Sequence, residues 1–244
     1  AARGATHVRA PGVTTAGACR GGRRETWGSV QGGTAVPGAV TGKPLRMGGT
    51  LGHAGATSSG VLVCTRGAFA EMDVDMVGRR AVIQGFGKVG GPLAFLLQSA
   101  GMRVVAVADV AGAVYNPGGL DIPELSEHVK TTGSVAGYPV GDHIAASEVF
   151  SVPTDLFVPA ALGGVIDAGV AERMTATLVV EAANGPTMPD ADPVFERKGT
   201  VVVPDILANS GGVTASDFEW AQSRQGYMWD QDVFATRLRA SMDA

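Results

Sequence analysis

Short apolar runs alternate with segments of helical periodicity from about residue 35 to the end of the chain. Two segments, 57–72 and 91–101, carry apolar residues near helical spacing, and Gly101 is a typical helix end. Continuous runs rich in Val and Ala suit parallel strands that are covered on both faces. Such runs occupy 79–85, 103–109, 154–160, 177–183 and 200–205. The alternation predicts an α/β fold built on a doubly wound sheet.

The last residues begin another amphipathic helix. Phe234, Leu238 and Met242 follow one another at intervals of four residues and form one apolar strip. We expect this strip to be exposed in the 244-residue chain, because no further segment is present to cover it.

The first 34 residues differ in composition from the rest. They hold eight glycines and five arginines against a single acid, Glu25. Their large apolar residues are too few and too irregular to form a buried face. We therefore expect 1–34 to be poorly structured, and we divide the chain into this segment and a domain over 35–244.

Composition excludes several classes of protein. Apolar residues make up 45% of the chain and charged residues 17%, with a net charge of −4, which is typical of soluble globular proteins and gives no reason to expect a nucleic-acid partner. No run of about 18 apolar residues predicts a membrane span, and the N-terminus does not resemble a signal peptide. Cys19 and Cys64 lack metal or redox spacing, so we expect no metal site and a cytoplasmic location.

A glycine cluster follows the first predicted strand. Gly85, Gly87 and Gly90 have the spacing of a turn that binds the pyrophosphate of a dinucleotide. In such a turn, the first glycine permits a sharp bend and the second lets the phosphates approach the backbone. The third lets the helix pack closely on the strand, and the helix N-terminus favours the anion.

An acid stands where this kind of site binds the adenosine ribose. Asp109 ends the second predicted strand, 19 residues after Gly90. Its charge would repel a 2′-phosphate and so favours NAD, although Arg103 or Lys130 would compensate if either lay near. The alternative interpretation is a tight strand-to-helix turn in which Asp109 caps a helix or a turn.

Five motifs occur in an order and spacing that resemble a known family. They are VTGKPLRMGGTLGHAGATSSGV at 40–61, AVIQGFGKVG at 81–90, LFVPAAL at 156–162, VVEAANGPTMPDAD at 179–192 and ILANSGGVTASDFEWAQSRQGYMW at 206–229. Together they resemble the cofactor-binding domain of the glutamate dehydrogenases, within the glutamate/leucine/phenylalanine/valine dehydrogenase family. The resemblance covers roughly 35–240 and implies a Rossmann-like sheet that binds NAD, with NADP possible.

The resemblance implies a role for individual residues. The phosphate turn is matched by Gly85, Phe86, Gly87, Lys88, Val89 and Gly90, with Lys88 where the family usually has Asn. The nicotinamide side of the cofactor is matched by Thr57, Ala160, Ala161, Asn184 and Asn209, and Ser216 matches the serine that contacts the side-chain carboxylate of glutamate. Plainer alternatives stay open: Thr57 as a helix N-cap, the asparagines as turn residues, Ser216 as a satisfied helix serine and the alanines as packing.

The sequence departs from the family where the family's acid–base chemistry is expected. The resemblance implies two lysines and an aspartate in another domain, but no lysine precedes Lys43, and Gly12 occupies the position of the aspartate. We assign no catalytic residue and expect the substrate domain to be largely absent. The Gly- and Arg-rich stretch within 1–34 is typical of a reading-frame slip in GC-rich coding sequence.

The resemblance therefore implies an oxidoreductase of amino acid metabolism. Complete members convert L-glutamate to 2-oxoglutarate and ammonia with NAD(P), and we expect this chain alone to be inactive. The alternative is a silent dinucleotide-binding module, or a chain that complements a separate substrate domain. Complete enzymes are homo-hexamers, but we expect no hexamer here because the missing domain supplies much of that interface.

Overall fold

The computed structural model describes residues 32–33 and 37–243. Cys19 and almost all of 1–34 lie outside the described residues, and so do the expected domain boundary near residue 35 and the proposed reading-frame slip. The predictions made for them stay predictions.

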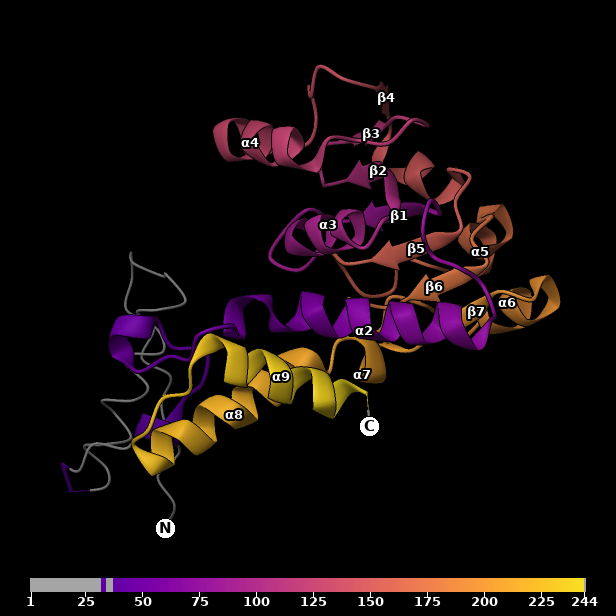
Figure 1. Ribbon diagram of the computed structural model, residues 1–244. Helices are drawn as coiled ribbons and strands as arrows, with labels where there is room; N and C mark the ends of the chain where they lie inside the picture. The colour runs from indigo at the N-terminus through magenta and orange to yellow at the C-terminus, as the bar shows by residue number, and fades with distance from the viewer. Residues whose placement is uncertain (1–31, 34–36, 244) are drawn as a thin grey trace, which may run out of the picture.

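A seven-stranded sheet with the order β4-β3-β2-β1-β5-β6-β7 forms the centre of the molecule (Figure 1). The strands are β1 (Arg80–Gln84), β2 (Arg103–Ala108), β3 (Ala113–Tyr115), β4 (Asp142–Ile144), β5 (Leu156–Pro159), β6 (Leu178–Val180) and β7 (Val201–Val203). The strands β2, β1, β5, β6 and β7 are parallel neighbours, and β3 and β4 add an antiparallel edge. All five predicted strands are present, and the doubly wound sheet is confirmed.

The β3–β4 edge was not predicted from the sequence. Each of these strands has only three residues, and two of the three in β4 are exposed, so no apolar run marks them.

Helices cover both faces of the sheet. One layer consists of α2 (Ala56–Glu71), α3 (Gly90–Ser99) and α4 (Ile122–Thr132), and the other of η4 (Ala146–Ser151), α5 (Ala168–Arg173) and α6 (Asp192–Lys198). Within β1, Ala81 and Ile83 belong to the core beneath the first layer, and Val82 belongs to the core beneath the second. This alternation explains why all three residues are fully buried, as expected for a strand covered on both sides.

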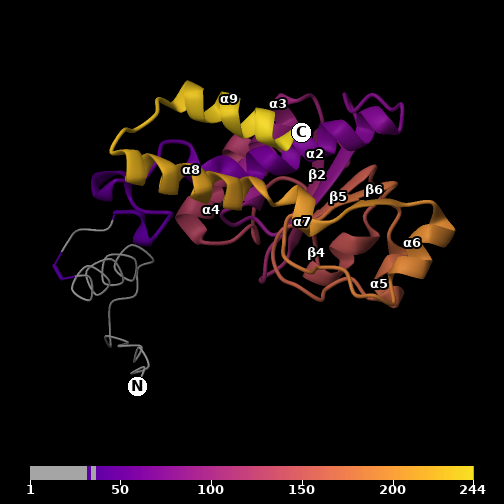
Figure 2. The same ribbon diagram turned by 90° about the horizontal axis from the view of Figure 1, so that it is seen from below.

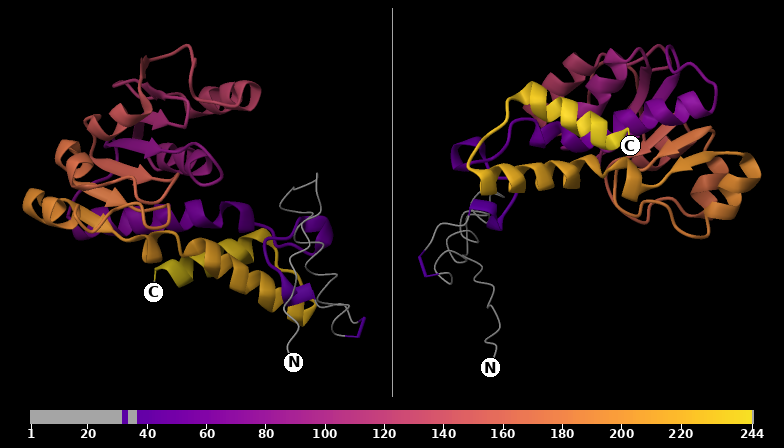
Figure 3. Two further views of the ribbon diagram at one scale, coloured as in Figure 1. Left: turned by 180° about the vertical axis from the view of Figure 1, so that it is seen from behind. Right: turned by 60° about the horizontal axis from the view of Figure 1, so that its bottom comes forward.

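Two C-terminal helices pack on α2, on its side away from the sheet (Figures 2 and 3). They are α8 (Gly211–Gln225) and α9 (Gln231–Met242), and they follow the short helix α7 (Asp205–Ala208). Among the described residues, α2 is preceded by the 3₁₀ turns η1 (Pro37–Ala39), η2 (Leu45–Met47) and η3 (His53–Gly55).

The expectation of an exposed C-terminal strip is wrong. Phe234 and Leu238 are only 2% and 4% exposed, and Met242 is half-buried. The Phe234 ring packs at right angles on Phe218 with 5.8 Å between centroids, and it lies so close to Gly52 that a Cβ there would be 2.5 Å from it. The strip is covered because α9 folds back onto α2 and α8, a long-range contact that periodicity does not reveal.

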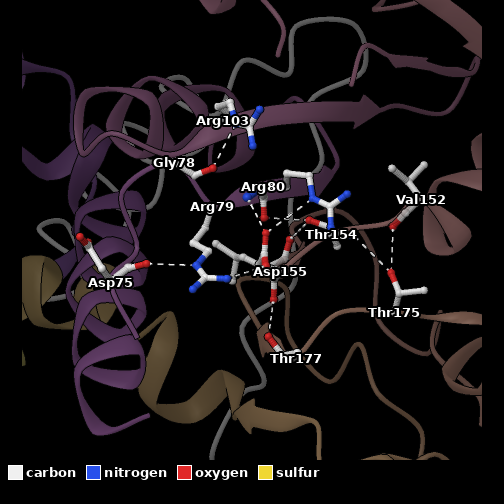
Figure 4. A network of polar contacts seen from close by, with 11 residues as sticks. Asp75, Gly78, Arg79, Arg80, Arg103, Val152, Thr154, Asp155, Thr175 and Thr177 are labelled. Carbon is white, nitrogen blue, oxygen red and sulfur yellow. Dashed lines mark hydrogen bonds and ion pairs between the residues drawn. The ribbon is translucent and has the colours of Figure 1, made fainter. Parts of the chain in front are cut away.

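A polar network joins the N-terminal ends of β1 and β5, at the sheet edge where these strands begin (Figure 4). The Asp155 carboxylate accepts a hydrogen bond from the Arg80 backbone N–H at 2.8 Å and lies 3.5 Å from the Arg79 guanidinium. Nearby, the Arg103 guanidinium donates to the carbonyl of Gly78 at 3.0 Å. This edge is therefore occupied by the protein's own polar contacts.

None of the helices in the described part of the chain has both the length and the hydropathy that a membrane crossing requires. Within the same residues, no group of three or more His, Cys, Asp or Glu side chains lies together as metal ligands would.

Candidate dinucleotide-binding site

The centre of the sheet contains a topological switch point between β1 and β5. From β1 the chain proceeds to β2 on one side, and it later returns to place β5 on the other. Ligands of such sheets bind in the crevice at the carboxyl ends of these two strands. Gly85 follows β1 and Ala160 follows β5, and a Cβ on Gly85 would lie 2.8 Å from the Ala160 carbonyl oxygen. The predicted phosphate turn and the predicted nicotinamide segment therefore meet at the switch point.

The three glycines of the turn face different surroundings. Gly85 has a φ of +106°, which residues with a side chain rarely adopt. A Cβ on Gly90 would lie 1.8 Å from the Gly85 carbonyl oxygen, so only glycine permits this approach of α3 to the strand. A Cβ on Gly87 would meet nothing within 4 Å. The backbone at Gly87 is thus bare and open, as the approach of a pyrophosphate requires.

The remaining residues of the turn differ in how firmly they are held. The Val89 carbonyl accepts a hydrogen bond from the buried Ser58 hydroxyl at 2.9 Å, which joins the turn to α2. Phe86 is half-buried and packs against the core, whereas Lys88 is exposed. Gly90 begins α3, whose helix dipole favours an anion at this end. The N–H groups of Gly91 and Leu93 already donate to the Gly87 and Val89 carbonyls at 3.0 Å.

Asp109 lies just beyond the end of β2, and backbone groups hold its carboxylate. Oδ1 accepts from the Ala111 N–H and Oδ2 from the Val135 N–H, each at 2.8 Å. Burial alone would raise the pKa of Asp109, but these hydrogen bonds and one from Ser134 outweigh it and lower the pKa. A carboxylate offers about four lone-pair sites, so these three donors leave about one for a ribose hydroxyl. The turn-capping alternative is thus observed, and it leaves the ribose role open.

The two cations considered as compensating charges are held elsewhere. Arg103 begins β2, and Asp109 follows the end of the same strand, so the strand's length of roughly 20 Å separates them. Lys130 lies on α4 and pairs with Glu127 at 3.0 Å. Neither forms an ion pair with Asp109.

The residues predicted for the nicotinamide side come from four segments: the start of α2 and the stretches that follow β5, β6 and α7. The Asn209 amide donates to the Asn184 side-chain oxygen at 2.8 Å, so the structure brings both asparagines together. Thr57 lies in the first turn of α2, beside Gly212 of α8, where a Cβ would be 2.5 Å from its Oγ1. The N-cap of α2 is Gly55, and no side chain caps the helix, so the N-cap alternative for Thr57 is wrong.

Ser216 lies on α8 and is half-buried. Its hydroxyl donates to the Gly212 carbonyl one turn earlier at 3.2 Å. The alternative role of a satisfied helix serine is therefore observed, while contact with a substrate stays a prediction.

A buried carboxylate that the sequence analysis did not single out lies one turn beyond Ser216. Glu219 is 0% exposed, and its oxygens contact Gly42 N at 3.0 Å, Lys43 N at 3.1 Å, Lys43 Nζ at 2.7 Å and His53 Nδ1 at 2.7 Å. We call these four residues the Glu219 cluster. Burial alone would raise the pKa of Glu219, but the hydrogen bonds from His53 and Lys43 outweigh it and lower the pKa to about 2. A sequence signal existed, because Glu219 continues the buried positions of α8 four residues after Ala215.

A hollow of about 560 Å³ opens beside the phosphate turn. Phe86, Gly87 and Gly91 border it on one side, and Gly55 and Lys130 border it on others. Asp109 and the two asparagines do not line it, so it represents only part of the surface that an extended dinucleotide would cover.

Fold and turn together define a Rossmann-like α/β domain with a glycine turn at the switch point of its sheet. The chain belongs to the glutamate/leucine/phenylalanine/valine dehydrogenase family, whose sequence model matches residues 48–244.

Individual relatives in this family are glutamate dehydrogenases. The enzyme of Thermotoga maritima is 47% identical over 211 residues, which cover 86% of this chain and 51% of that protein. The catabolic NAD-specific glutamate dehydrogenase RocG of Bacillus subtilis is 43% identical over 206 residues, which cover 84% of this chain and 48% of that protein. This chain therefore spans about half the length of these curated relatives.

Solved structures show the same correspondence. The Leu-bound form of the hetero-hexameric glutamate dehydrogenase from Thermus thermophilus superposes with a TM-score of 0.86 at 35% identity, covering 93% of this chain and 53% of that chain. Glutamate dehydrogenase from Peptoniphilus asaccharolyticus superposes with a TM-score of 0.78 at 32% identity, covering 95% of this chain and 55% of that chain.

Proposed function

We propose that this chain is the cofactor-binding half of a glutamate dehydrogenase and that it holds NAD along the carboxyl edge of its sheet. The observation that carries the proposal is the meeting of Gly85 and Ala160 at the switch point, with the bare backbone of Gly87 open beside them. In the complete reaction, the nicotinamide would take a hydride from Cα of glutamate, and water would then release 2-oxoglutarate and ammonia.

The preference for NAD rests on Asp109. Backbone N–H groups fix its carboxylate and lower its pKa, so the group stays ionised at neutral pH and would repel a 2′-phosphate. The Bacillus relative is itself named NAD-specific. The free, buried thiol of Cys64 suits the cytoplasm, which is the compartment we propose.

We propose further that the 244-residue chain has no turnover by itself. Its four lysines all lie in the described residues. The Lys43 ammonium is buried and contacts Glu219, the Val40 carbonyl and the Ser223 hydroxyl, while Lys130 and Lys198 lie on outer helices. Lys88 stands on the phosphate turn. None is left to activate water or to hold the α-carboxylate of glutamate.

Two measurements test the proposal. Titration with NADH, followed by the fluorescence of the reduced nicotinamide, should give saturable binding in the micromolar to millimolar range. Incubation with glutamate and NAD, and separately with NADP, should give no steady rise in absorbance of the reduced cofactor. Measurable turnover would refute the proposal that the chain alone is inactive. Absence of NADH binding would refute the proposed cofactor site.

A complementation experiment distinguishes the cofactor-binding half of a two-part enzyme from a dinucleotide-binding module with no catalytic role. The substrate domain of a complete relative, added to this chain, should restore glutamate-dependent reduction of NAD if the two halves associate. We expect no hexamer of this chain alone, a point that sedimentation of the purified protein decides.

A further inference from the structure

The Glu219 cluster connects two elements that the nicotinamide side requires. Gly42, Lys43 and His53 belong to the segment that leads directly into α2, and Glu219 belongs to α8. A fully buried carboxylate with four donors fixes this segment far more firmly than an exposed ion pair would.

Both connected elements carry predicted cofactor residues close to the cluster. Thr57 follows His53 by four residues, and Asn209 lies two residues before the start of α8. The two elements also touch without the cluster, because a Cβ on Gly211 would lie 2.4 Å from the Ala56 carbonyl oxygen. Close glycine contacts thus set the spacing at one point, and Glu219 sets it two helical turns further along α8.

The adenosine side is built from other parts of the chain. Asp109 follows β2 and is fixed by Ala111 and Val135, neither of which belongs to the cluster. A change in the spacing of α2 and α8 should therefore disturb one half of a bound dinucleotide and leave the other half in place.

We propose that Glu219 is a positioning residue for the nicotinamide half of the cofactor site, a role that rests on the proposed binding of NAD. Its carboxylate holds the N-terminal turn of α2 against α8, so that Thr57 and the Asn184–Asn209 pair keep one fixed separation. Charge is essential to this role, because three of the four groups facing Glu219, the backbone N–H groups of Gly42 and Lys43 and the Lys43 ammonium, can only donate. Glu219→Gln keeps the volume but turns an N–H₂ group toward those donors.

The experiment compares two ligands that differ only in the nicotinamide half. NADH and ADP-ribose are titrated calorimetrically into the wild-type chain, Glu219→Gln and Asp155→Asn. Asp155→Asn is the matched control, because it also removes a carboxylate charge from a polar network but acts at the opposite edge of the sheet.

Glu219→Gln should weaken NADH binding about tenfold and leave the ADP-ribose affinity within about twofold. Asp155→Asn should leave the ratio of the two affinities unchanged even where it lowers the melting temperature. Equal losses for both ligands in Glu219→Gln would show a purely structural role and overturn the inference. A wild-type chain that binds neither ligand contradicts the proposed function and this inference together.

If Glu219→Gln does not fold, two variants of His53 test the same inference with a smaller change to the cluster. His53→Ala removes one donor and leaves the buried Lys43–Glu219 pair intact. It should weaken NADH binding about threefold without affecting ADP-ribose. His53→Asn, whose amide reaches the place of Nδ1, should restore the NADH affinity; failure of both effects overturns the inference.

Discussion

Gly87→Val separates cofactor binding from folding more sharply than any other change in the phosphate turn. A Cβ at Gly87 meets nothing within 4 Å, and its φ lies outside the left-handed region, so the folded chain has room for a side chain. We expect a loss of stability of about 0.5 kcal/mol, which is usual for surface substitutions and lowers the melting temperature by about 1–2 °C. The same side chain would occupy the space through which the pyrophosphate approaches the backbone.

The expected loss of binding follows from that geometry. Displacing the pyrophosphate removes charge-assisted hydrogen bonds to the turn, each worth about 1.5–3 kcal/mol. Loss of two of them lowers the NADH affinity by about 100-fold or more.

Gly90→Ala is the matched comparison within the same turn. Its Cβ would lie 1.8 Å from the Gly85 carbonyl oxygen, so backbone must move. Overpacking of this kind costs about 1–3 kcal/mol, and we expect a clear fall in melting temperature. NADH titration and thermal melting of both variants decide the matter. A Gly87→Val chain that melts normally and still binds NADH within about threefold of wild type would refute the assignment of the phosphate turn.

Three further predictions concern charged groups. The folded pKa of Glu219 is depressed to about 2 from its ordinary value near 4.5, so its contribution to stability is complete above pH 4.5 and is lost as the pH falls toward 2. Urea unfolding should show a loss of roughly 3 kcal/mol from this group over that window, absent in Glu219→Gln. Lys43→Met leaves the buried Glu219 charge unpaired and should cost about 3–5 kcal/mol, whereas Lys130→Met in an exposed pair should cost less than about 1 kcal/mol by the same measurement. Asp109→Ser removes the charge that repels a 2′-phosphate and should raise the NADPH-to-NADH affinity ratio by about tenfold; an unchanged ratio would count against Asp109 as the source of the preference.

The parallel core of the fold was predictable because each of its strands is buried on both faces. Five continuous apolar runs predicted the five parallel strands, and the glycine spacing predicted a turn directly after β1. The β3–β4 edge escaped prediction because each strand has only three residues and two of those in β4, Asp142 and His143, are polar and exposed. Likewise, the burial of Phe234 and Leu238 depends on α9 folding back, which no local pattern encodes.

The sequence also could not predict which side chains of the candidate site contact one another. Motif order suggested that Asn184 and Asn209 act together, but only the fold shows their hydrogen bond across 25 residues of chain. The partners of Glu219 lie more than 160 residues earlier in the sequence, so a carboxylate inside an amphipathic helix gave no hint of which donors would satisfy it. Such contacts arise from tertiary packing, which sequence periodicity constrains only weakly.

The position of Lys43 supports the proposed separation of cofactor binding from acid–base chemistry in this chain. It is the first lysine of the sequence, and a lysine that activates water needs an accessible amine whose proton can leave. The Lys43 ammonium instead donates to a carbonyl and a hydroxyl while paired with a fully buried carboxylate. These three contacts use all three N–H donors of the ammonium, so the cluster that joins the segment before α2 to α8 leaves this lysine no donor for a substrate. This geometry supports the proposal that the chain holds the cofactor and depends on a second polypeptide segment for the reaction.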